Sequence, residues 1–299
     1  MLNSSRWILT NRKKFDIVWV SKHSDTVSLQ LINHILKMPY VSSLEGYDPI
    51  EAESAKKSKY VFAISNFIKE KCEKDYKYSP EMITIGVDTL KFEKVKISEI
   101  NKIKKKYCPN KEFLVLNVGR LVGPKDMETF VRAALEVSRV CSKIKFLICG
   151  NGPEKSRIIR LINEYKLQKK VFLISDLTDK EIVKYFRSAD LFVHVPKSSN
   201  HFGVVYLEAM AAGLPIIAAN EDATPHTVGN AAILVKKENP EEMSKAIIKL
   251  FKDRKLSTKL SKNARIKVEK EFNWEIIVDK LENFFEKAIR NNQSYNLDH

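Results

Sequence analysis

The stretch that decides the fold covers residues 189–219 and reads ADLFVHVPKSSNHFGVVYLEAMAAGLPIIAA. It opens with an apolar run over 191–195, which predicts a buried parallel strand. Apolar side chains at helical spacing then predict a helix that stops before Gly213, and 214–219 predicts the next buried strand. The helical apolar positions are Val204, Leu207, Met210 and Ala211. In such a strand, loop, helix and strand unit, the loop and the first helical turn form a ligand crevice, because free N–H groups and the helix dipole converge there.

Two residues of this stretch are placed to meet a ligand in that crevice. Gly203 stands just before the predicted helix, where the missing side chain lets a ligand approach the backbone. Glu208 stands one turn into the helix, and its apolar neighbours Leu207 and Met210 indicate that it is not on a freely solvated face. Glu208 is either a ligand-binding carboxylate or a favourable charge near a helix start.

The segment PKSSNHFGVVYLEAMAAGLPIIA resembles the signature of the family 4 retaining glycosyltransferases, roughly P-S-x-x-E-x-F-G-x-x-x-x-E-A-M-A-x-G-x-P-V-I-A. Eight positions fall in register without a gap: Pro196, Phe202, Gly203, Glu208, Ala209, Met210, Gly213 and Pro215. One position departs from the pattern. The family carries two glutamates eight positions apart, and this chain has Asn200 in place of the first and Glu208 as the second.

Length and composition predict a cytoplasmic protein of two domains. A chain of 299 residues accommodates two domains of roughly 150 residues each. Its four cysteines form neither a CxxC pair nor a metal-ligand spacing, and there is no DxD pair or His/Cys/Asp cluster, so we expect no metal site. No apolar run approaches the length of a membrane span, and the N-terminus lacks the apolar segment of a signal peptide.

A formal net charge of +15 predicts a negatively charged partner. Nucleic acid is disfavoured, because the charge is mostly lysine on helix-like segments and no aromatic-interleaved pattern concentrates it. The lysine-rich segment 93–110 carries Ile97, Ile100 and Ile103 on one helical face. This segment is either a solvated connector or a contact to an anionic membrane surface, which would make the protein peripheral on the inner membrane face.

The first part of the chain predicts alternating strands and helices, which favours a parallel sheet. Strand patterns occupy 15–21, 39–43, 60–65 and 82–85, and helix patterns occupy 29–36, 50–59 and 67–73. These segments resemble the later strands of the family's N-terminal domain, whose glycine-rich opening loop has no counterpart here. The resemblance therefore implies a shortened first domain, either as a fragment or as a natural reduction.

The second part repeats the alternation more regularly, with predicted strands at 113–118, 144–149, 170–174 and 232–235 around the opening stretch. The fold class is therefore predicted as α/β and GT-B-like, with two Rossmann-type parallel-sheet domains of which the first is truncated. We expect a partial acceptor-side domain over 1–95, a linker over 96–110, a nucleotide-sugar-binding domain over 111–273, a terminal helix over 274–290 that returns to the first domain, and a polar tail over 291–299.

A basic motif follows the first strand of the second domain, where Gly119, Arg120 and Lys125 resemble the family's G-R-L-x-x-x-K-G. In the family, its arginine and lysine hold the donor diphosphate. Two fixed cations would stabilise the negative charge left on a nucleoside diphosphate without a metal. The alternative is that Arg120 and Lys125 pair with surface carboxylates. Asp126 stands where the family usually has glycine.

Two further loops resemble donor-side loops of the family. Gly150-Asn151-Gly152-Pro153 is similar to its G-x-G-P motif, which we interpret as a structural turn because it is neither GxGxxG nor a phosphate-binding P-loop. Ser175, Asp176 and Leu177 follow a predicted strand where the family's backbone meets the nucleobase, which assigns Ser175 and Leu177 to donor binding.

The remaining candidates are assigned by resemblance around the transferred sugar. Asn200, His201 and Phe202 would line the sugar, and the backbone at Gly203 and Val204 would contact the diphosphate. Glu208 would hold the ribose hydroxyls. Glu45, which follows a predicted strand of the first domain, is a candidate for the carboxylate that Asn200 does not supply.

The resemblance implies a metal-independent retaining hexosyltransferase that needs no cofactor beyond a UDP- or GDP-sugar co-substrate, and a glycan or lipid-linked acceptor. The departures at Asn200 and in the first domain favour a second hypothesis, a catalytically inactive subunit that binds donor nucleotide or a partner transferase. An NAD-dependent Rossmann enzyme is disfavoured, because no GxGxxG follows any predicted strand.

Overall fold

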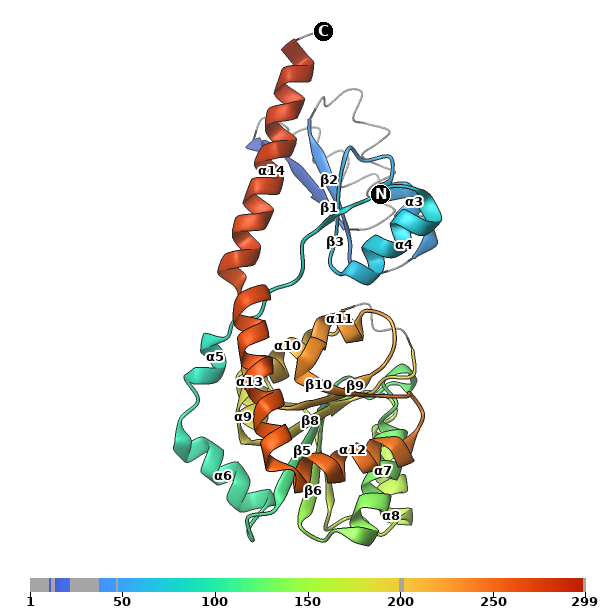
Figure 1. Cartoon of the computed structure of the whole chain (residues 1–299), viewed down its shortest axis with the longest axis vertical. Coiled ribbons are helices and arrows are strands. Elements are labelled where there is room, and N and C mark those ends of the chain that lie inside the picture. Colours follow the sequence, from blue (N-terminus) through green and yellow to red (C-terminus); the bar gives the residue numbers. More distant parts are fainter. Residues whose placement is uncertain (1–10, 12–13, 22–37, 47, 199–201, 298–299) are drawn as a thin grey trace. The chain divides into compact units, whose positions relative to one another are not determined.

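The computed structural model describes residues 11, 14–21, 38–46, 48–198 and 202–297. Its contacts divide the chain into two compact units, which are shown by sequence colour in Figure 1. Unit 1 consists of residues 1–85 and 274–299, and unit 2 consists of residues 86–273. Unit 2 is thus inserted into the sequence of unit 1. The helix predicted at 29–36 lies outside the described residues.

Unit 1 contains a parallel sheet of four strands in the order β1-β2-β3-β4. The strands are β1 (Val18–Val20), β2 (Tyr40–Leu44), β3 (Tyr60–Ala63) and β4 (Glu81–Met82), and the helices are α3 (Pro49–Ala55), α4 (Asn66–Tyr76) and α14 (Trp274–Leu297). Phe284 of α14 packs edge-on against Tyr60 and Phe62 of β3, with ring centroids 6.2 and 5.6 Å apart. These aromatic contacts join the last segment of the chain to the core of unit 1.

Unit 2 contains a parallel sheet of six strands in the order β10-β9-β8-β5-β6-β7. Its strands are β5 (Phe113–Val118), β6 (Ile144–Cys149), β7 (Val171–Ile174), β8 (Leu191–His194), β9 (Ile216–Ala219) and β10 (Ala232–Val235). The chain builds β6 and β7 on one side of β5 and then returns to place β8 on the other side. This is the doubly wound order, and the reversal at β5 and β8 is the point where such folds bind ligands.

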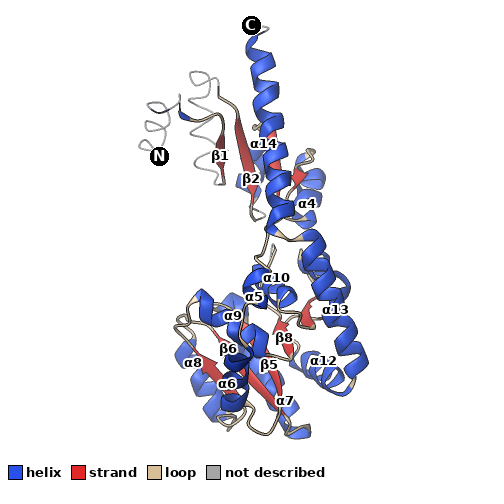
Figure 2. Cartoon of the chain, turned by 90° about the vertical axis from the view of Figure 1, so that its left-hand side faces the viewer, coloured by secondary structure: helices blue, strands red, loops and turns tan. Residues whose placement is uncertain are grey.

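Helices cover both faces of this sheet, as Figure 2 shows. They are α5 (Leu90–Glu93), α6 (Ile97–Tyr107), α7 (Met127–Val140), α8 (Lys155–Glu164), α9 (Asp179–Ser188), α10 (Val204–Ala211), α11 (Thr224–Val228), α12 (Pro240–Lys252) and α13 (Arg254–Glu271). On one face, Val115 and Val193 join a core with side chains of α7, α8 and α12. On the other face, Phe192 packs against Phe186 of α9 and Tyr206 of α10. Burial on both faces explains why these strands are continuous apolar runs.

Most predicted elements of unit 2 coincide with observed ones within two residues. The segment expected to be a linker, 96–110, holds α6, and the contacts assign it to unit 2. The two ends of unit 2 lie side by side: Val87 pairs with Asn273 in a parallel bridge, and the Val87 amide donates to the Phe272 carbonyl at 2.8 Å. The chain therefore enters and leaves unit 2 at one place.

Candidate functional site

The candidate site lies in unit 2, at the carboxyl ends of β5 and β8. The loop after β5 begins at Gly119, and the loop after β8 begins at Val195. The Lys197 amide donates to the Pro124 carbonyl at 3.0 Å, which holds the two loops together. The predicted diphosphate-binding motif and the predicted sugar-binding loop are therefore neighbours at the reversal point of the sheet.

Glycines let the β5 and β6 loops approach each other closely. A Cβ atom on Gly150 would lie 1.9 Å from the Gly119 carbonyl oxygen, which no side chain can accommodate. The Leu121 amide donates to the Asn151 carbonyl at 2.8 Å, and the Glu154 amide donates to the Leu121 carbonyl at 3.0 Å. These contacts support the interpretation of Gly150-Asn151-Gly152-Pro153 as a structural turn.

Arg120 and Lys125 bring two positive charges to this loop. Among the described residues, neither forms an ion pair, although Lys125 is half-buried. Burial, together with the neighbouring Arg120 guanidinium, lowers the pKa of Lys125 below its ordinary value. Two cations that repel each other and lack a carboxylate partner create a site that an anion would stabilise.

Asp126 takes a structural role at the position where the family usually has glycine. Its backbone is left-handed, with φ of 50°, a conformation that glycine adopts freely and that aspartate tolerates. Its carboxylate caps α7 by accepting from the Thr129 amide at 3.2 Å, and it lies 3.7 Å from Lys197 Nζ. The carboxylate therefore stabilises the helix start and the loop instead of neutralising Arg120 or Lys125.

His194, the last residue of β8, is a polar residue that the sequence reasoning did not single out. It is fully buried, and neither ring nitrogen has a hydrogen-bond partner in the described part of the chain. Its ring packs against Tyr206 with centroids 5.5 Å apart, and the Tyr206 hydroxyl donates to its carbonyl at 2.7 Å. Burial, with the nearby Lys125 charge, lowers the pKa of His194 to about 3. In the sequence, the feature that points to His194 is a histidine within an otherwise apolar strand.

Glu208 lies in the second turn of α10, and its carboxylate forms no hydrogen bond or ion pair among the described residues. Burial, followed by repulsion from Asp179 at the start of α9, raises the pKa of Glu208 to about 7, and Lys91 of α5 offsets this in part. A partly buried carboxylate without a donor is suited to accept hydrogen bonds from a ligand's hydroxyls. The proximity of Lys91 to Glu208 could not be predicted, because its helix α5 is only one turn long.

The start of α10 is exposed backbone. Gly203 caps the helix in the left-handed conformation, with φ of 79°, and Val204 in its first turn is 43% exposed. Phe202 is buried, and its ring packs against Phe272 with centroids 5.9 Å apart. Only the backbone of Phe202 is thus left for ligand contact. Asn200 and His201 lie outside the described residues.

A polar network occupies the ends of β6 and β7. Asn151 donates to Asp176 at 2.8 Å, Ser175 donates to Asp176 at 2.8 Å, and Lys155 donates to Ser175 at 2.5 Å. Asp176 is held in a left-handed conformation, with φ of 61°. The side chain of Ser175 is thus engaged within the protein, while Leu177 is partly buried beside it.

Glu45 lies apart from these residues in the sequence of unit 1. It follows β2 directly and is exposed. Within the described part of the chain, no group of three or more His, Cys, Asp or Glu side chains gathers as a metal-binding cluster. The same residues include no helix that is both long and apolar enough to span a bilayer.

Comparison with known proteins gives one family. The family model for glycosyl transferases group 1 matches residues 98–267, which is more than half of the chain. An uncharacterized glycosyltransferase of Methanocaldococcus jannaschii is 28% identical over 238 residues, or 78% of this chain and 60% of the relative. A GDP-mannose-dependent monoacylated alpha-(1-6)-phosphatidylinositol monomannoside mannosyltransferase of Corynebacterium glutamicum is 26% identical over 219 residues, or 70% of this chain and 57% of the relative. The chain thus spans about three fifths of the length of these relatives.

Solved structures share the fold. The Anabaena protein HepE, crystallised with UDP, superposes with a TM-score of 0.85 over 95% of this chain and 81% of HepE, at 17% identity. The likeness confirms the predicted GT-B-like α/β class with two parallel sheets.

Proposed function

The chain belongs to the glycosyl transferases group 1 family, and on this premise we propose that it transfers a hexose from a UDP- or GDP-linked donor to a glycan or lipid-linked acceptor with retention of configuration. Retention is supported by the resemblance of residues 196–218 to the retaining family 4 signature. A lipid-linked acceptor would bring the chain to a membrane, and we also propose peripheral contact with an anionic leaflet.

The observation that carries this proposal is the pair of cations without carboxylate partners at the reversal point of the sheet. Cleavage of the bond between the sugar and the diphosphate leaves negative charge on the departing nucleoside diphosphate. Arg120 and Lys125 would stabilise that charge, and Asp126 does not cancel them because it caps α7. Cations arranged before the reaction stabilise the developing charge without reorganisation, which lowers the barrier.

Further residues complete the proposed site. The Gly203 backbone and the exposed first turn of α10 would meet the diphosphate. Glu208 would accept hydrogen bonds from the ribose hydroxyls. Ser175 and Leu177 would contact the base. Asn200 and His201 would line the sugar, and Glu45 would supply a carboxylate from unit 1. The UDP bound to HepE and the GDP-mannose dependence of the Corynebacterium relative support a nucleotide donor of one of these two kinds.

The test is calorimetric titration of the full chain with UDP, GDP and a panel of their sugar conjugates. We expect one nucleotide to bind, and Arg120→Gln or Lys125→Gln to weaken it by roughly tenfold or more, since charge-assisted hydrogen bonds contribute about 1.5–3 kcal/mol each. Lys262→Gln, an exposed cation on α13, should leave the affinity unchanged. Equal affinity in all three variants would contradict the assignment of the diphosphate to Arg120 and Lys125.

Turnover then tests the activity. Incubation with the donor that binds should yield a new glycoside, or slow donor hydrolysis, whose anomeric configuration by NMR matches that of the donor. Because Arg120 and Lys125 are proposed to take the role of a metal, we expect the rate to be unchanged by EDTA. A product of inverted configuration would exclude retention, and loss of activity with EDTA that added Mg²⁺ restores would exclude metal independence.

A second candidate is favoured by one observation, the neutral Asn200 in place of the family's first glutamate. In this case the chain would bind donor nucleotide without transferring the sugar, and would act beside a partner transferase. Tight nucleotide binding without turnover, together with turnover by the Asn200→Glu variant, would support this candidate over the first.

A further inference from the structure

Helix α6 lies in front of the sheet of unit 2, beside α9 (Figure 2), and its two faces differ in their residues. Its inner face packs on the protein: Tyr107 contacts Phe172 of β7 and Tyr185 of α9, with ring centroids 5.2 and 6.4 Å apart. Glu99 pairs with Lys184 at 2.6 Å, and Lys104 pairs with Asp190. These contacts fix which side of α6 faces solvent.

The outer face of α6 and its flanks is uniformly basic. We call this surface the basic face and define it as Lys94, Lys96, Lys102, Lys105, Lys106 and Lys111. All six are exposed, and no ion pair is found for them among the described residues. The only acidic residue between 94 and 111 is Glu99, which is partly exposed and pairs with Lys184. The basic face therefore carries a large excess of positive charge.

This charge is unfavourable for the helix itself. Lys102 and Lys106 are four residues apart, where like charges repel by a few tenths of a kcal/mol. Lys96 occupies the N-cap of α6 and makes no capping hydrogen bond, at the end of the helix where the dipole disfavours cations. The dipoles account for Lys94, which caps the carboxyl end of α5, and for the lysines of the last turn of α6. Lys96 and Lys102 reduce the stability of α6 and are better explained by a partner.

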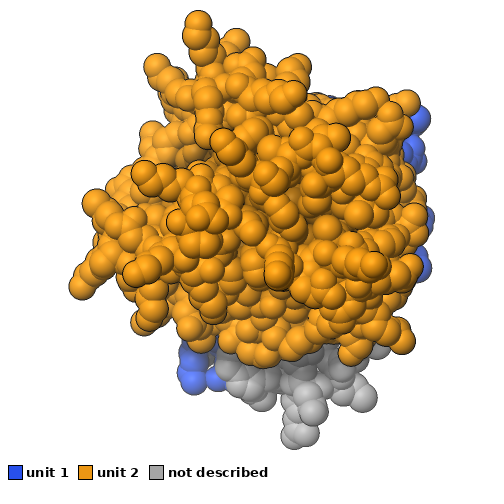
Figure 3. Space-filling model, turned by 90° about the horizontal axis from the view of Figure 1, so that it is seen from below, with its two compact units in different colours: residues 1–85, 274–299 blue, residues 86–273 orange. Residues whose placement is uncertain are grey.

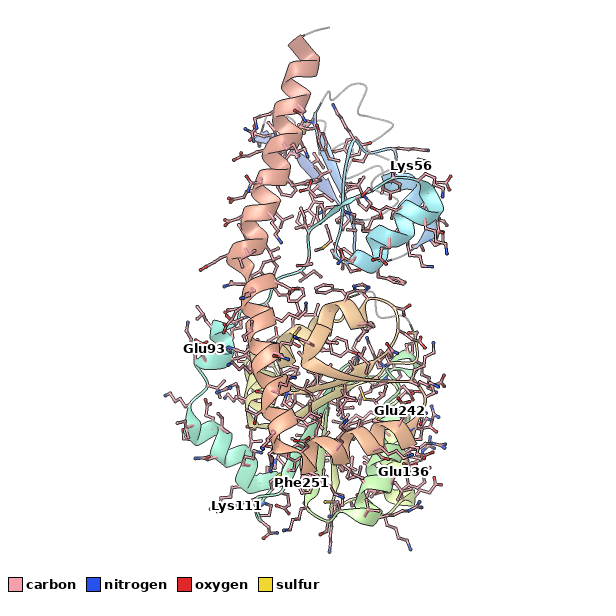
Figure 4. The ribbon with its side chains drawn as sticks, viewed as in Figure 1. Lys56, Glu93, Lys111, Glu136, Glu242 and Phe251 are labelled. Carbon is pink, nitrogen blue, oxygen red and sulfur yellow. The ribbon has the colours of Figure 1, made fainter. Side chains whose placement is uncertain are left out.

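The basic face continues into a cavity at the amino-terminal edge of the sheet. The cavity has a volume of about 390 Å³, and four cations and two carboxylates line it: Lys104, Lys105, Lys111, Arg254, Glu112 and Asp190. Arg254 stands in the first turn of α13, again where the helix dipole disfavours a cation, and its guanidinium lies 5.3 Å from the centre of the Phe113 ring. Figure 4 places Lys111 and Phe251 at this end of unit 2, and Figure 3 views the same end with long side chains projecting from it.

We propose that the basic face, with this cavity at its edge, docks unit 2 on an anionic lipid bilayer. The inference specifies the peripheral contact proposed above. Lysines suit a diffuse layer of lipid phosphates, because each contributes about 1 kcal/mol near such a surface without needing a fixed geometry. Ile97, which is 75% exposed beside the lysines, provides an aliphatic side chain for the interfacial region. The exposed aromatic residues of the described chain, Phe15, Trp19 and Trp274, lie elsewhere in the sequence, so the face lacks stacking platforms for nucleic acid.

Docking on the basic face would leave the donor site open. Helix α6 ends just before β5 begins, so its carboxyl end and the cavity lie at the amino-terminal edge of the sheet. Arg120 and Lys125 follow the carboxyl end of β5, at the opposite edge. Substitutions on the basic face should therefore not change nucleotide binding, which separates this inference from the proposed reaction.

The test is co-sedimentation of the full chain with vesicles of phosphatidylcholine alone and of phosphatidylcholine mixed with phosphatidylglycerol. We expect binding only to the mixed vesicles, weakening as salt screens the charges. Lys102→Gln, Lys105→Gln and Lys106→Gln together should weaken it on the order of 100-fold. The matched control, Lys259→Gln, Lys262→Gln and Lys270→Gln on α13, removes the same charge from exposed positions and should retain most of the binding.

Three results would overturn the inference: no binding to the mixed vesicles, equal losses in the two triple variants, or a single-stranded RNA that binds the basic face more tightly than the vesicles do. Inorganic pyrophosphate added as a competitor distinguishes a lipid surface from a small-anion site in the cavity. If low concentrations displace the protein from vesicles, and do so equally for the Arg120→Gln variant, the ligand of the basic face is a small anion in the cavity and not the bilayer. Nucleotide titration of the same samples reports on the donor site independently.

Discussion

Glu208, which we propose to bind the ribose hydroxyls, carries a penalty for stability, because no donor among the described residues pairs with its partly buried carboxylate. Burial raises its pKa from 4.5 to about 7, so the folded chain holds the proton more tightly than the unfolded chain does. The free energy of unfolding is therefore expected to decrease as pH rises through this interval. The proposed ribose contact requires the ionised carboxylate, so the affinity for nucleotide should increase as pH rises.

Glu208→Gln tests both consequences. We expect the variant to be more stable than the wild type by about 1–3 kcal/mol at pH 8, with the difference closing toward pH 5, as measured by urea denaturation. Its nucleotide affinity should be low at every pH, whereas that of the wild type should fall as pH drops below about 7. Glu164→Gln, an exposed carboxylate on α8, is the control and should change neither quantity. A stability difference that does not depend on pH would contradict the buried ionised carboxylate.

The buried His194 should make the protein less stable as pH falls, whereas Glu208 makes it less stable as pH rises. Its pKa falls from 6.5 to about 3 on folding, so the unfolded chain takes up a proton that the folded chain refuses. Above pH 6.5, His194 makes its full contribution to the free energy of unfolding. This contribution decreases as pH falls, by about 2 kcal/mol at pH 5. His194→Leu should remove this pH dependence in denaturation curves, while His226→Ala, at an exposed position, should leave it intact. If the free energy of unfolding decreased equally at low pH in both variants, groups other than His194 would be the cause.

At the scale of the elements, the donor site depends on how closely two loops approach. The β5 loop presents Arg120 and Lys125, and the β6 loop supports it through backbone hydrogen bonds that only glycine at position 150 permits. The cations are therefore positioned by a neighbouring strand's turn and not only by their own loop. The close approach gives the G-x-G-P motif a structural reason that needs no contact with a phosphate.

Gly150→Ala should separate these loops. A Cβ at 1.9 Å from the Gly119 oxygen forces backbone movement, and we expect a loss of about 3 kcal/mol or more in unfolding free energy, together with weaker nucleotide binding. Gly123→Ala is the matched control, because the atom nearest to its added Cβ is the Glu154 carboxylate at 3.9 Å. It should change stability by less than about 0.5 kcal/mol. Similar effects of both substitutions would show that the contact between the loops is not the cause.

The elements that sequence could predict are those with long apolar runs or strong helical spacing. Strands β5, β6 and β8 were predicted because burial on both faces makes them continuously apolar. The helices α5 and α11 were not, because four and five residues are too few to show a period. Helix α14 was expected to end at 290 and continues to Leu297, since no glycine or proline interrupts the polar tail.

The candidate site was predictable only where a residue's position in the chain implies its position in the sheet. Arg120, Lys125 and Gly203 follow strands, so the reversal of strand order brings their loops together. The burial of His194 and the proximity of Lys91 to Glu208 depend on how helices pack on the sheet, which no spacing in the sequence reveals. Glu45 lies in the other unit, and its role stays a prediction.

At the scale of the whole molecule, nearly all proposed donor-binding residues belong to unit 2. A fragment spanning residues 86–273 keeps the six-stranded sheet, both helical layers and the bridge between Val87 and Asn273. We expect this fragment to bind the same nucleotide as the full chain, within about threefold in Kd, and to lack sugar transfer. Calorimetry on the fragment checks the affinity. A folded fragment that binds no nucleotide would place part of the donor site in unit 1.

The bridge between Val87 and Asn273 also bears on how such a protein can be re-engineered or diversified. Because both junctions of unit 2 meet at one point, the segment between them is a self-contained cassette with adjoining ends. Since we propose that unit 2 holds the donor site, exchange of this segment for that of a relative should change the nucleotide that the chimaera binds and leave the sequence of unit 1 unchanged. Two closely spaced junctions would then be enough to combine a new donor site with an existing unit 1.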